Sequence, residues 1–352
     1  MAVSEAATIS TGVRLIEAVP VAAAPVRRAG RGVVRSRAAA KQGDLFTNLS
    51  FENFKNSGER AIEFARVSTV SGRSGADRAQ IFDALRLLRA IAQGRETAAF
   101  PALWFGADWP TKLSIALSTQ RHGRLTYSVT VQRVNDSRVR VLEERLDGRT
   151  GSLLQRRRHF YMLSATKEKY GVGSASFALY DAAKVLGADD PVVHFKRMLG
   201  DLWLINPDPN AMKSEIGAAV VNADTGDFAD FATCMVLQQR QAPVVAAMRE
   251  ALLHLCPGLM GYSVELSSRG LPYLAVHHQG DLTPKGTPFA MIDNAEKIQF
   301  LVAFVCAMNK CSAQAPVVWL SPFNWLGERE RAAAERLARA AFAARGQMIM
   351  LG

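Results

Sequence analysis

Hydrophobic and polar positions alternate in short runs through the first half of the chain, which is the pattern of half-buried strands. The runs at 45–56 and 61–72 are rich in aromatic and β-branched residues and are bounded by Asn, Gly and Ser. A glycine-containing turn follows, and residues 78–93 then repeat apolar side chains with the period of a helix. Its predicted buried stripe consists of Ile81, Leu85, Leu88 and Ala92, flanked by Phe82 and Ile91.

Three further alternating runs, at 112–120, 125–134 and 138–146, predict antiparallel strands. Each run is followed by a pair of residues that favours a turn: His122-Gly123, Asn135-Asp136 and Asp147-Gly148.

The second half mixes helical and strand-like patterns. Residues 155–260 are irregular and contain several prolines, and 244–256 form their clearest amphipathic helix. Strands are predicted within 261–279, a helix at 293–310, a buried strand at 316–320, a helix at 328–345 and a last strand at 347–351. This order predicts an α/β fold in four parts: a basic arm (1–43), an N-terminal lobe (44–154), a mainly helical insertion (155–260) and a C-terminal lobe (261–352).

Composition narrows the class of protein. The chain has 352 residues, of which 49% are hydrophobic and 21% charged. No run reaches the roughly 18 to 20 apolar residues of a membrane span, so we expect no integral membrane protein. The net charge of +11 favours an anionic partner, with nucleic acid the first candidate.

Much of that charge lies in the arm. Residues 1–43 carry seven basic residues against two acidic ones. The arm is open to three interpretations: a solvated segment, a segment that binds nucleic acid or an acidic partner, and a cleaved transit peptide. No apolar secretory segment follows a basic start, so a cytoplasmic location is expected. The candidate contacts are Arg27, Arg28, Arg31, Arg35, Arg37 and Lys41.

The cysteines and histidines do not predict a metal site. Cys234, Cys256, Cys306 and Cys311 lie in apolar surroundings without C-x-x-C spacing, which is typical of buried, reduced thiols. His277 and His278 are neighbours in a strand-like run and would point to opposite faces. We therefore predict no metal.

The turn between the second predicted strand and the first helix stands where a phosphate-binding loop belongs. It reads Ser71-Gly72-Arg73-Ser74-Gly75-Ala76-Asp77-Arg78-Ala79, with Asp83-Ala84-Leu85 following in the helix. With Asn53-Phe54 before it, this order resembles the head domain of SMC, RecF and OLD-type ABC ATPases, which carry an N-F motif, a loop of the form G-x-N-G-x-G-K-S and a helix with D-A-L. The resemblance covers most of 45–351 and implies a P-loop NTPase-like ABC ATPase head with an antiparallel β subdomain and a helical insertion.

The loop departs from the family's chemistry. Gly72 and Gly75 are kept, but Asp77 replaces the last glycine, Arg78 the lysine and Ala79 the hydroxyl residue that ligates Mg²⁺. The carboxylate of Asp77 would repel phosphate, and the planar guanidinium of Arg78 does not simply replace an ammonium. The degenerate cofactor-binding candidates are Gly72, Gly75 and Arg78.

Two further family motifs are also altered. In Ile292-Asp293-Asn294-Ala295-Glu296-Lys297, the residues Asn294, Glu296 and Lys297 are in register with the signature motif, but its serine and glycine are gone. After the apolar run 317–320, Ser321 and Pro322 replace the aspartate and glutamate of the Walker B motif. The strand at 347–351 is followed only by Gly352, without the family's switch histidine.

These departures favour a catalytically degenerate head that acts as a binding or structural module, with a protein partner or a second copy, no cofactor and no catalytic residues. Two alternatives stay open. One is an active, DNA-coupled ATPase of repair or anti-phage type that uses Arg78 in place of lysine. The other is a nucleic-acid-binding protein that acts through its basic arm.

Three smaller features complete the prediction. Arg156, Arg157 and Arg158 form a basic cluster, with a solvated face as the default and contact with nucleic acid or an acidic partner as the alternative. Asp208, between Pro207 and Pro209, is expected to cap a helix. Trp319, Phe323 and Trp325 are expected in the core rather than at an interface.

Overall fold

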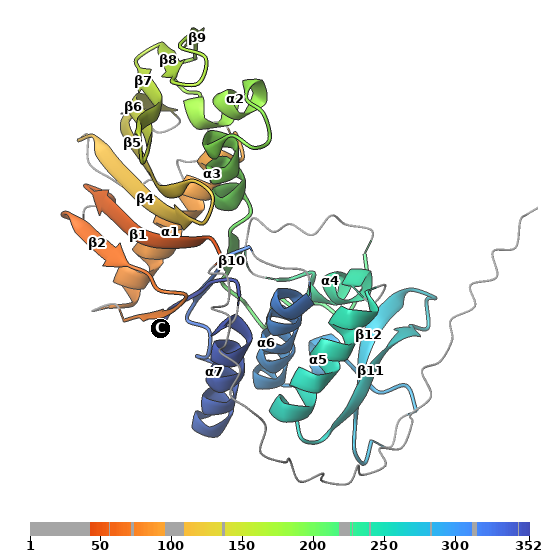
Figure 1. Cartoon of the computed structure of the whole chain (residues 1–352). Coiled ribbons are helices and arrows are strands. Elements are labelled where there is room, and N and C mark those ends of the chain that lie inside the picture. Colours follow the sequence, from red (N-terminus) through yellow and green to blue (C-terminus); the bar gives the residue numbers. More distant parts are fainter. Residues whose placement is uncertain are drawn as a thin grey trace, which may run out of the picture. The chain divides into compact units, whose positions relative to one another are not determined.

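A computed structural model of the chain shows two lobes built on separate sheets (Figure 1). It describes residues 43–55, 57–71, 74–95, 109–135, 138–217, 226, 228–238, 241–281, 284–311, 315–343 and 345–352. The arm residues Arg27, Arg28, Arg31, Arg35, Arg37 and Lys41, as well as Gly72, lie outside the described residues. Residues 40–352 form one compact unit.

The N-terminal lobe is an eight-stranded sheet in which every neighbouring pair of strands is antiparallel. Its strand order is β2 (Arg60–Glu63), β1 (Leu45–Glu52), β4 (Thr111–Thr119), β5 (Gly123–Asn135), β6 (Arg138–Gly148), β7 (Gly151–Arg157), β8 (Phe160–Leu163) and β9 (Lys169–Gly171).

Alternation along these strands explains the two faces of the sheet. In β5, Leu125, Tyr127, Val129 and Val131 are all buried, whereas Thr126, Ser128 and Thr130 between them are partly exposed. Successive side chains of a strand point to opposite faces, so the apolar set lies together on one side. The predicted runs at 112–120, 125–134 and 138–146 are confirmed as β4, β5 and β6.

Three helices cover the apolar face: α1 (Gly75–Ala92), α2 (Ala178–Val185) and α3 (Pro191–Gly200). The predicted stripe of α1 is confirmed, because Ile81, Leu85, Leu88 and Ala92 are buried. Helix α3 begins where the sequence provides both a cap and a proline: the Asp190 carboxylate accepts the Val192 N–H at 2.8 Å, and Pro191 occupies the first turn.

The C-terminal lobe contains a four-stranded parallel sheet with the order β10 (Trp203–Ile205), β14 (Val317–Leu320), β15 (Met348–Leu351) and β3 (Val67–Val70). Strands β14 and β15 are short, continuous apolar runs, as is typical of parallel strands buried on both faces. The sequence run 61–72 therefore contributes β2 to one sheet and β3 to the other.

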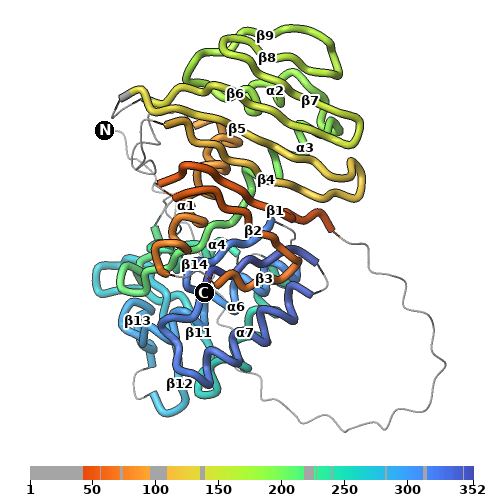
Figure 2. Tube along the Cα trace, turned by 90° about the vertical axis from the view of Figure 1, so that its left-hand side faces the viewer, coloured from red at the N-terminus to blue at the C-terminus, as the bar shows by residue number. Residues whose placement is uncertain are grey.

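The second core packs around α4 (Phe231–Gln238), α5 (Ala242–Leu255), α6 (Asn294–Cys311) and α7 (Glu328–Ala343). A three-stranded sheet of β11 (Leu259–Leu266), β12 (Pro272–His278) and β13 (Thr287–Pro288), with the short 3-10 helix η3 (Phe289–Met291), completes this lobe (Figure 2). Among the helices that the structure describes, none combines the length and hydropathy needed to cross a lipid bilayer.

The expected start of a helical insertion at residue 155 is wrong. Residue 154 lies inside β7, and residues up to Gly171 continue the antiparallel sheet as β8 and β9. The strands escaped detection because a charged residue, Arg156, takes one inward position between the apolar Leu154 and Tyr161. The helices within 178–255 are also divided, with α2 and α3 in the first core and α4 and α5 in the second.

Candidate functional site: the carboxyl edge of the parallel sheet

The carboxyl ends of the four parallel strands meet at one edge of the sheet. The Ser321 N–H, directly after β14, donates to the Leu351 carbonyl at 2.8 Å, and the Gly352 N–H donates to the Val70 carbonyl at 3.3 Å. In open parallel sheets, ligands bind outside the carboxyl ends of the strands. This edge is therefore where a nucleotide site would lie.

Helix α1 begins at this edge, with four residues between the end of β3 and Gly75. Ser74 caps it: the Ser74 side chain accepts the Asp77 N–H at 3.2 Å, and the Ser74 carbonyl accepts the Arg78 N–H at 3.4 Å. The first turn of α1 thus runs through Gly75 to Arg78, where the family's loop would wrap a phosphate. A Cβ at Gly75 would meet only the Arg78 guanidinium, at an ordinary contact distance of 3.7 Å. A residue with a Cβ would therefore fit at position 75 without a steric clash.

Asp77 places a carboxylate over this helix start. Arg60 of β2 donates to the Asp77 carboxylate at 2.8 Å, and the Asp77 side chain is only 13% exposed. Negative charge in the first turn is stabilised by the helix dipole. The favourable position for an anion at the start of α1 is therefore occupied by the chain's own carboxylate, which is held there by a cation.

Arg78 and Ala79 complete the turn. Arg78 is partly exposed, and its Nε is buried without a hydrogen-bond partner among the described residues. Ala79 has no oxygen that could ligate a metal ion. Of the three groups that the family's loop supplies at these positions, only a positive charge remains.

The end of β14 also lacks carboxylates. Ser321 has a left-handed backbone with φ of 48°, and Pro322 follows it. Trp319 and Phe323 are buried, which confirms the expected core position, whereas Trp325 is 43% exposed.

The signature-like residues at the start of α6 bind other parts of the lobe. The Asp293 carboxylate caps the helix by accepting the Ala295 N–H at 2.8 Å. The Lys297 side chain is buried; its Nζ donates to the Pro209 carbonyl at 3.1 Å, and burial lowers its pKa. Asn294 donates to the Asn210 side chain at 2.9 Å. Both residues therefore hold the 206–210 turn, in which the Asp208 carboxylate accepts the Asn210 N–H at 3.0 Å.

Glu296 makes a separate contact, because its carboxylate lies 2.5 Å from Nε2 of His278 on β12. In the described structure, Asn294, Glu296 and Lys297 each have a partner within the chain. These contacts give Asn294, Glu296 and Lys297 a structural role in stabilising the fold.

The predicted surface cluster Arg156–Arg158 is partly wrong, because Arg156 is fully buried. Its guanidinium donates to the carbonyls of Gly173, Ser176 and Arg158, and it lies 3.7 Å from the Glu144 carboxylate. Arg157 and Arg158 are exposed and stay candidates for contact with a partner.

Glu144, which the sequence analysis did not single out, is the centre of this buried network. Its carboxylate accepts the Tyr127 O–H at 2.8 Å and the N–H groups of Ala178 and Leu179 at 2.7 Å, so it caps α2 from inside the core. Burial raises the pKa of Glu144 and lowers that of Arg156. The alternation of buried and exposed positions could have revealed the network. Tyr127 lies two residues from the buried Leu125, and Arg156 lies two residues from the buried Leu154, so both point to the core face of the sheet.

The cysteines lie in apolar surroundings, as expected. Cys234, Cys256 and Cys306 are buried, and burial raises their thiol pKa to about 11, 12 and 12. Cys311 is partly exposed. Within the described ranges, no three His, Cys, Asp or Glu side chains are placed to share a metal ion.

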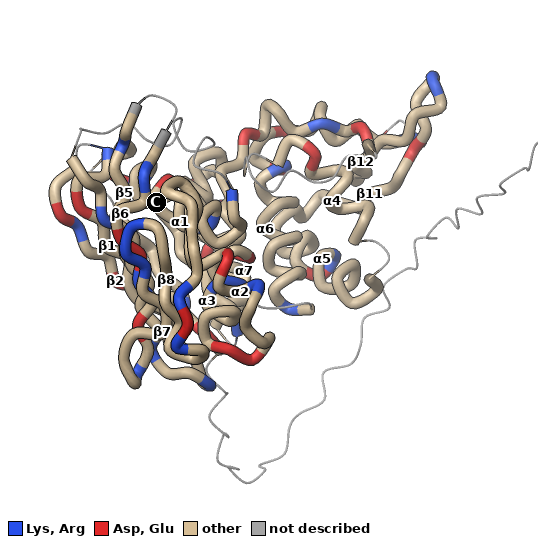
Figure 3. The backbone as a smooth tube through the Cα atoms, turned by 90° about the horizontal axis from the view of Figure 1, so that it is seen from above, with Lys and Arg blue, Asp and Glu red and all other residues tan. Residues whose placement is uncertain are grey.

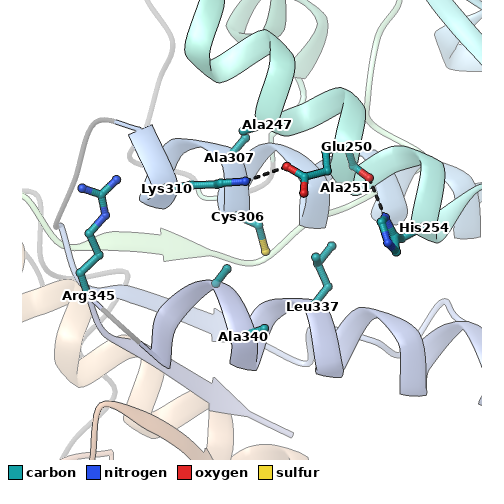
Figure 4. A pocket seen from close by; sticks show the side chains of 11 residues that line it. Ala247, Glu250, Ala251, His254, Cys306, Ala307, Lys310, Leu337, Ala340 and Arg345 are labelled. Carbon is teal, nitrogen blue, oxygen red and sulfur yellow. Dashed lines mark hydrogen bonds and ion pairs between the residues drawn. The ribbon is translucent and has the colours of Figure 1, made fainter. Parts of the chain in front are cut away.

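A pocket of about 420 Å³ lies apart from the strand edge, between α5, α6 and α7 (Figure 4). Small apolar residues such as Ala247, Ala307 and Ala340 line it. On its rim, Lys310 donates to the Glu250 carboxylate at 2.7 Å, and His254 Nδ1 lies 2.8 Å from the Glu250 carbonyl. The polar groups on this rim are largely paired with one another.

Comparison with known proteins finds similarity in solved structures only. No protein-family model matches the chain, and no curated protein matches it. The chain is similar to an SMC head bound to the C-terminal winged-helix domain of ScpA, at 14% identity over 87% of this chain and 89% of the other, with a TM-score of 0.47.

It is also similar to the SMC head domain from Thermotoga maritima, at 12% identity over 87% and 89% of the two chains, with a TM-score of 0.44. A third similar structure is the Pyrococcus furiosus SMC head with an extended coiled coil, bound to the C-terminal domain of ScpA, at 10% identity over 88% and 89%, with a TM-score of 0.48. These are heads of the class that the sequence resembles. The strand topology of the chain itself establishes the α/β class with an antiparallel subdomain.

Proposed function

We propose that this chain is a catalytically inactive ABC/SMC-type ATPase head that acts as a binding or structural module through protein contacts. The observation that carries the proposal is the Asp77–Arg60 ion pair at the start of α1. A phosphate that approached this helix would meet a carboxylate already stabilised by the helix dipole and by a guanidinium. Repulsion between the two anions, in a partly desolvated position, opposes binding.

The absence of catalytic groups from the motif positions supports the same conclusion. Phosphoryl transfer depends on a metal ion held by a hydroxyl and a carboxylate, and on an oriented nucleophile. The corresponding positions here are Ala79, Ser321 and Pro322. None of these three side chains can hold Mg²⁺ through a carboxylate or activate a water molecule.

The charge pattern of the described part favours a protein partner over nucleic acid. Lys and Arg are interspersed with Asp and Glu along the strands of the N-terminal lobe (Figure 3). Nucleic-acid surfaces require a field of one sign, whereas protein interfaces use both signs to set register. Nucleic-acid binding through the arm stays a separate prediction, because the arm lies outside the described residues.

Measurement of phosphate release from Mg·ATP by the purified full chain, with and without DNA, tests the proposal. We expect release no faster than in a blank without protein. The matched variant is Arg78→Ala, which removes the cation at the position of the family's lysine. The proposal would be overturned if the wild type released phosphate from ATP and the Arg78→Ala variant did not.

One observation favours the alternative of an active, DNA-coupled ATPase. Nε of Arg78 has no hydrogen-bond partner among the described residues, so this guanidinium keeps donor capacity for an anion. The same phosphate-release measurement separates the two functions, since the alternative requires turnover that depends on Arg78.

A further inference from the structure

The eight-stranded sheet has a second face, opposite the one that α1, α2 and α3 cover. Figure 2 looks onto the strands of this sheet. Adjacent residues show the division: Glu144 and Arg156 are buried, while their neighbours Glu143 and Arg157 are exposed. The outer face is therefore formed by the alternate residues that point away from the core.

Strand register places five outer-face residues in one row across β1, β4, β5, β6 and β7. Glu52 pairs with Lys112, Lys112 with Thr130, Thr130 with Glu143, and Glu143 with Arg157. The row carries the charges minus, plus, neutral, minus, plus. With strands about 4.8 Å apart, its ends are separated by roughly 19 Å.

This row is complementary to its own reverse. Read from the other end, it places a positive charge wherever the forward row has a negative one, with Thr130 at the centre. A two-fold axis that lies between two copies and runs along the strands brings the reversed row onto the original. Glu52 then faces Arg157 of the second copy, and Lys112 faces its Glu143.

The neighbouring row is compatible with the same axis. It consists of Ser50, Ser114, Ser128, Arg145 and Gln155, which register pairs in that order. Reversal places Ser114 against Arg145 of the second copy and Ser50 against its Gln155. Each of these contacts can form a hydrogen bond, and none opposes like charges.

The charges also select the axis. A two-fold axis across the strands would place Glu52 against Glu52 and Arg157 against Arg157, which is repulsive. An axis along the strands keeps the two sheets aligned, as in sandwiches, where strand directions differ by about 30°. Among the described residues, Glu52, Lys112, Glu143 and Arg157 form no ion pair within 4.0 Å, so their charges are available.

We infer that the outer face of this sheet binds a second copy of the chain in a two-fold, face-to-face dimer. Seven strand spacings and strands that average about seven residues give a face on the order of 800 Å², comparable with the roughly 800 Å² per partner of a stable interface. The partner of the proposed binding function would then be a second copy of the chain. This inference rests on the proposed function in one respect, namely that the chain is a protein-binding module.

Sedimentation equilibrium of the full chain over a range of concentrations and salt tests the dimer. We expect a monomer–dimer equilibrium that weakens as salt rises. Glu52→Arg and Arg157→Glu each convert two attractive pairs per dimer into repulsive ones, so each should raise the dissociation constant about tenfold or more. The double variant should restore it to within about threefold of the wild type, because both pairs are then attractive again.

Mixing provides an independent check. Glu52→Arg and Arg157→Glu repel themselves as homodimers, but in a mixed dimer positions 52 and 157 carry opposite charges at both contacts between the chains. We therefore expect the mixture to dimerise about tenfold more tightly than either variant alone. The control is Arg336→Glu, the same charge change at an exposed position of α7 in the other lobe, which should leave the dissociation constant unchanged.

A monomer at every concentration, or a dimer indifferent to the swaps at positions 52 and 157, would overturn the inference. Thermal unfolding of each variant establishes that it is folded. Phosphate release distinguishes the two proposals. A monomeric chain without turnover overturns only the dimer, and a dimer that hydrolyses ATP overturns only the proposed function.

Discussion

The side-chain amide of Gln347 pairs with the backbone of Phe46, 301 positions earlier in the chain. Its Nε2 donates to the Phe46 carbonyl at 2.6 Å, and its Oε1 accepts the Phe46 N–H at 2.9 Å. Gln347 precedes β15 in the parallel sheet, whereas Phe46 belongs to β1 of the antiparallel sheet. One fully buried amide thus joins the two sheets at the β1 bulge between Phe46 and Asn48.

Replacement of Gln347 by leucine should therefore destabilise the whole unit. The change leaves the buried Phe46 N–H and carbonyl without partners, at an expected cost of about 3 kcal/mol. Urea denaturation followed by circular dichroism measures it. Gln279→Leu, at an exposed position, is the control and should leave the midpoint unchanged. Equal midpoints for both variants would show that the amide does not stabilise the fold.

The buried position of Arg156 predicts a sharp contrast between two arginines. Arg156→Met removes the buried cation beside Glu144 and the guanidinium donor to the carbonyls of Arg158, Gly173 and Ser176, so it should cost about 3 to 5 kcal/mol of stability. Arg158→Met, at an exposed position, should cause no measurable change. If both variants unfold at the wild-type urea concentration, Arg156 does not have the buried partners described above.

Glu144 predicts a pH dependence of stability. Burial raises its folded-state pKa above the ordinary value of 4.5, so the folded state binds the proton more tightly than the unfolded state. The contribution of Glu144 to stability is then largest below pH 4.5 and is lost as pH rises towards the folded-state pKa.

Comparison with Glu144→Gln isolates this effect, because the other titrating groups are common to both proteins. From pH 4 upwards, the free energy of unfolding of the wild type should fall relative to that of the variant. Urea titrations at half-unit pH steps measure the difference. A difference that grows in favour of the wild type would contradict the predicted direction.

We expect Lys297, which lies at a position of the signature motif, to stabilise the fold. Lys297→Met removes a buried donor from the Pro209 carbonyl and should lower stability by about 1 to 3 kcal/mol. Lys285→Met, at an exposed lysine, is the matched control. Thermal unfolding measures both. A stable Lys297→Met protein would indicate that Lys297 is retained for a role other than anchoring the 206–210 turn.

Local patterns were enough to predict most elements. The alternation of Leu125, Tyr127, Val129 and Val131 predicted β5, and the stripe through Ile81 and Leu88 predicted α1. Each of these signals depends on neighbours in the sequence, because a period of two or 3.6 residues is a local property. The class of fold followed from the order of such elements.

Interactions between distant residues could not be predicted in the same way. Glu144 meets Arg156 only through the register of β6 with β7 and caps α2 only once that helix packs on the sheet, and Gln347 meets Phe46 only once both sheets have formed. At the candidate site, the sequence identified Asp77 of α1 as unfavourable to phosphate, but its partner Arg60 lies on strand β2. Long-range pairs of this kind depend on register, which composition does not determine.

Equilibrium binding of labelled Mg·ATP to the full chain tests the central claim most directly. We predict no saturable binding by the wild type, and a measurable gain in Asp77→Asn, which removes the carboxylate at the start of α1 while preserving its shape. Micromolar binding by the wild type that is lost in Arg78→Ala would contradict the account, because the start of α1 would then hold a nucleotide despite Asp77.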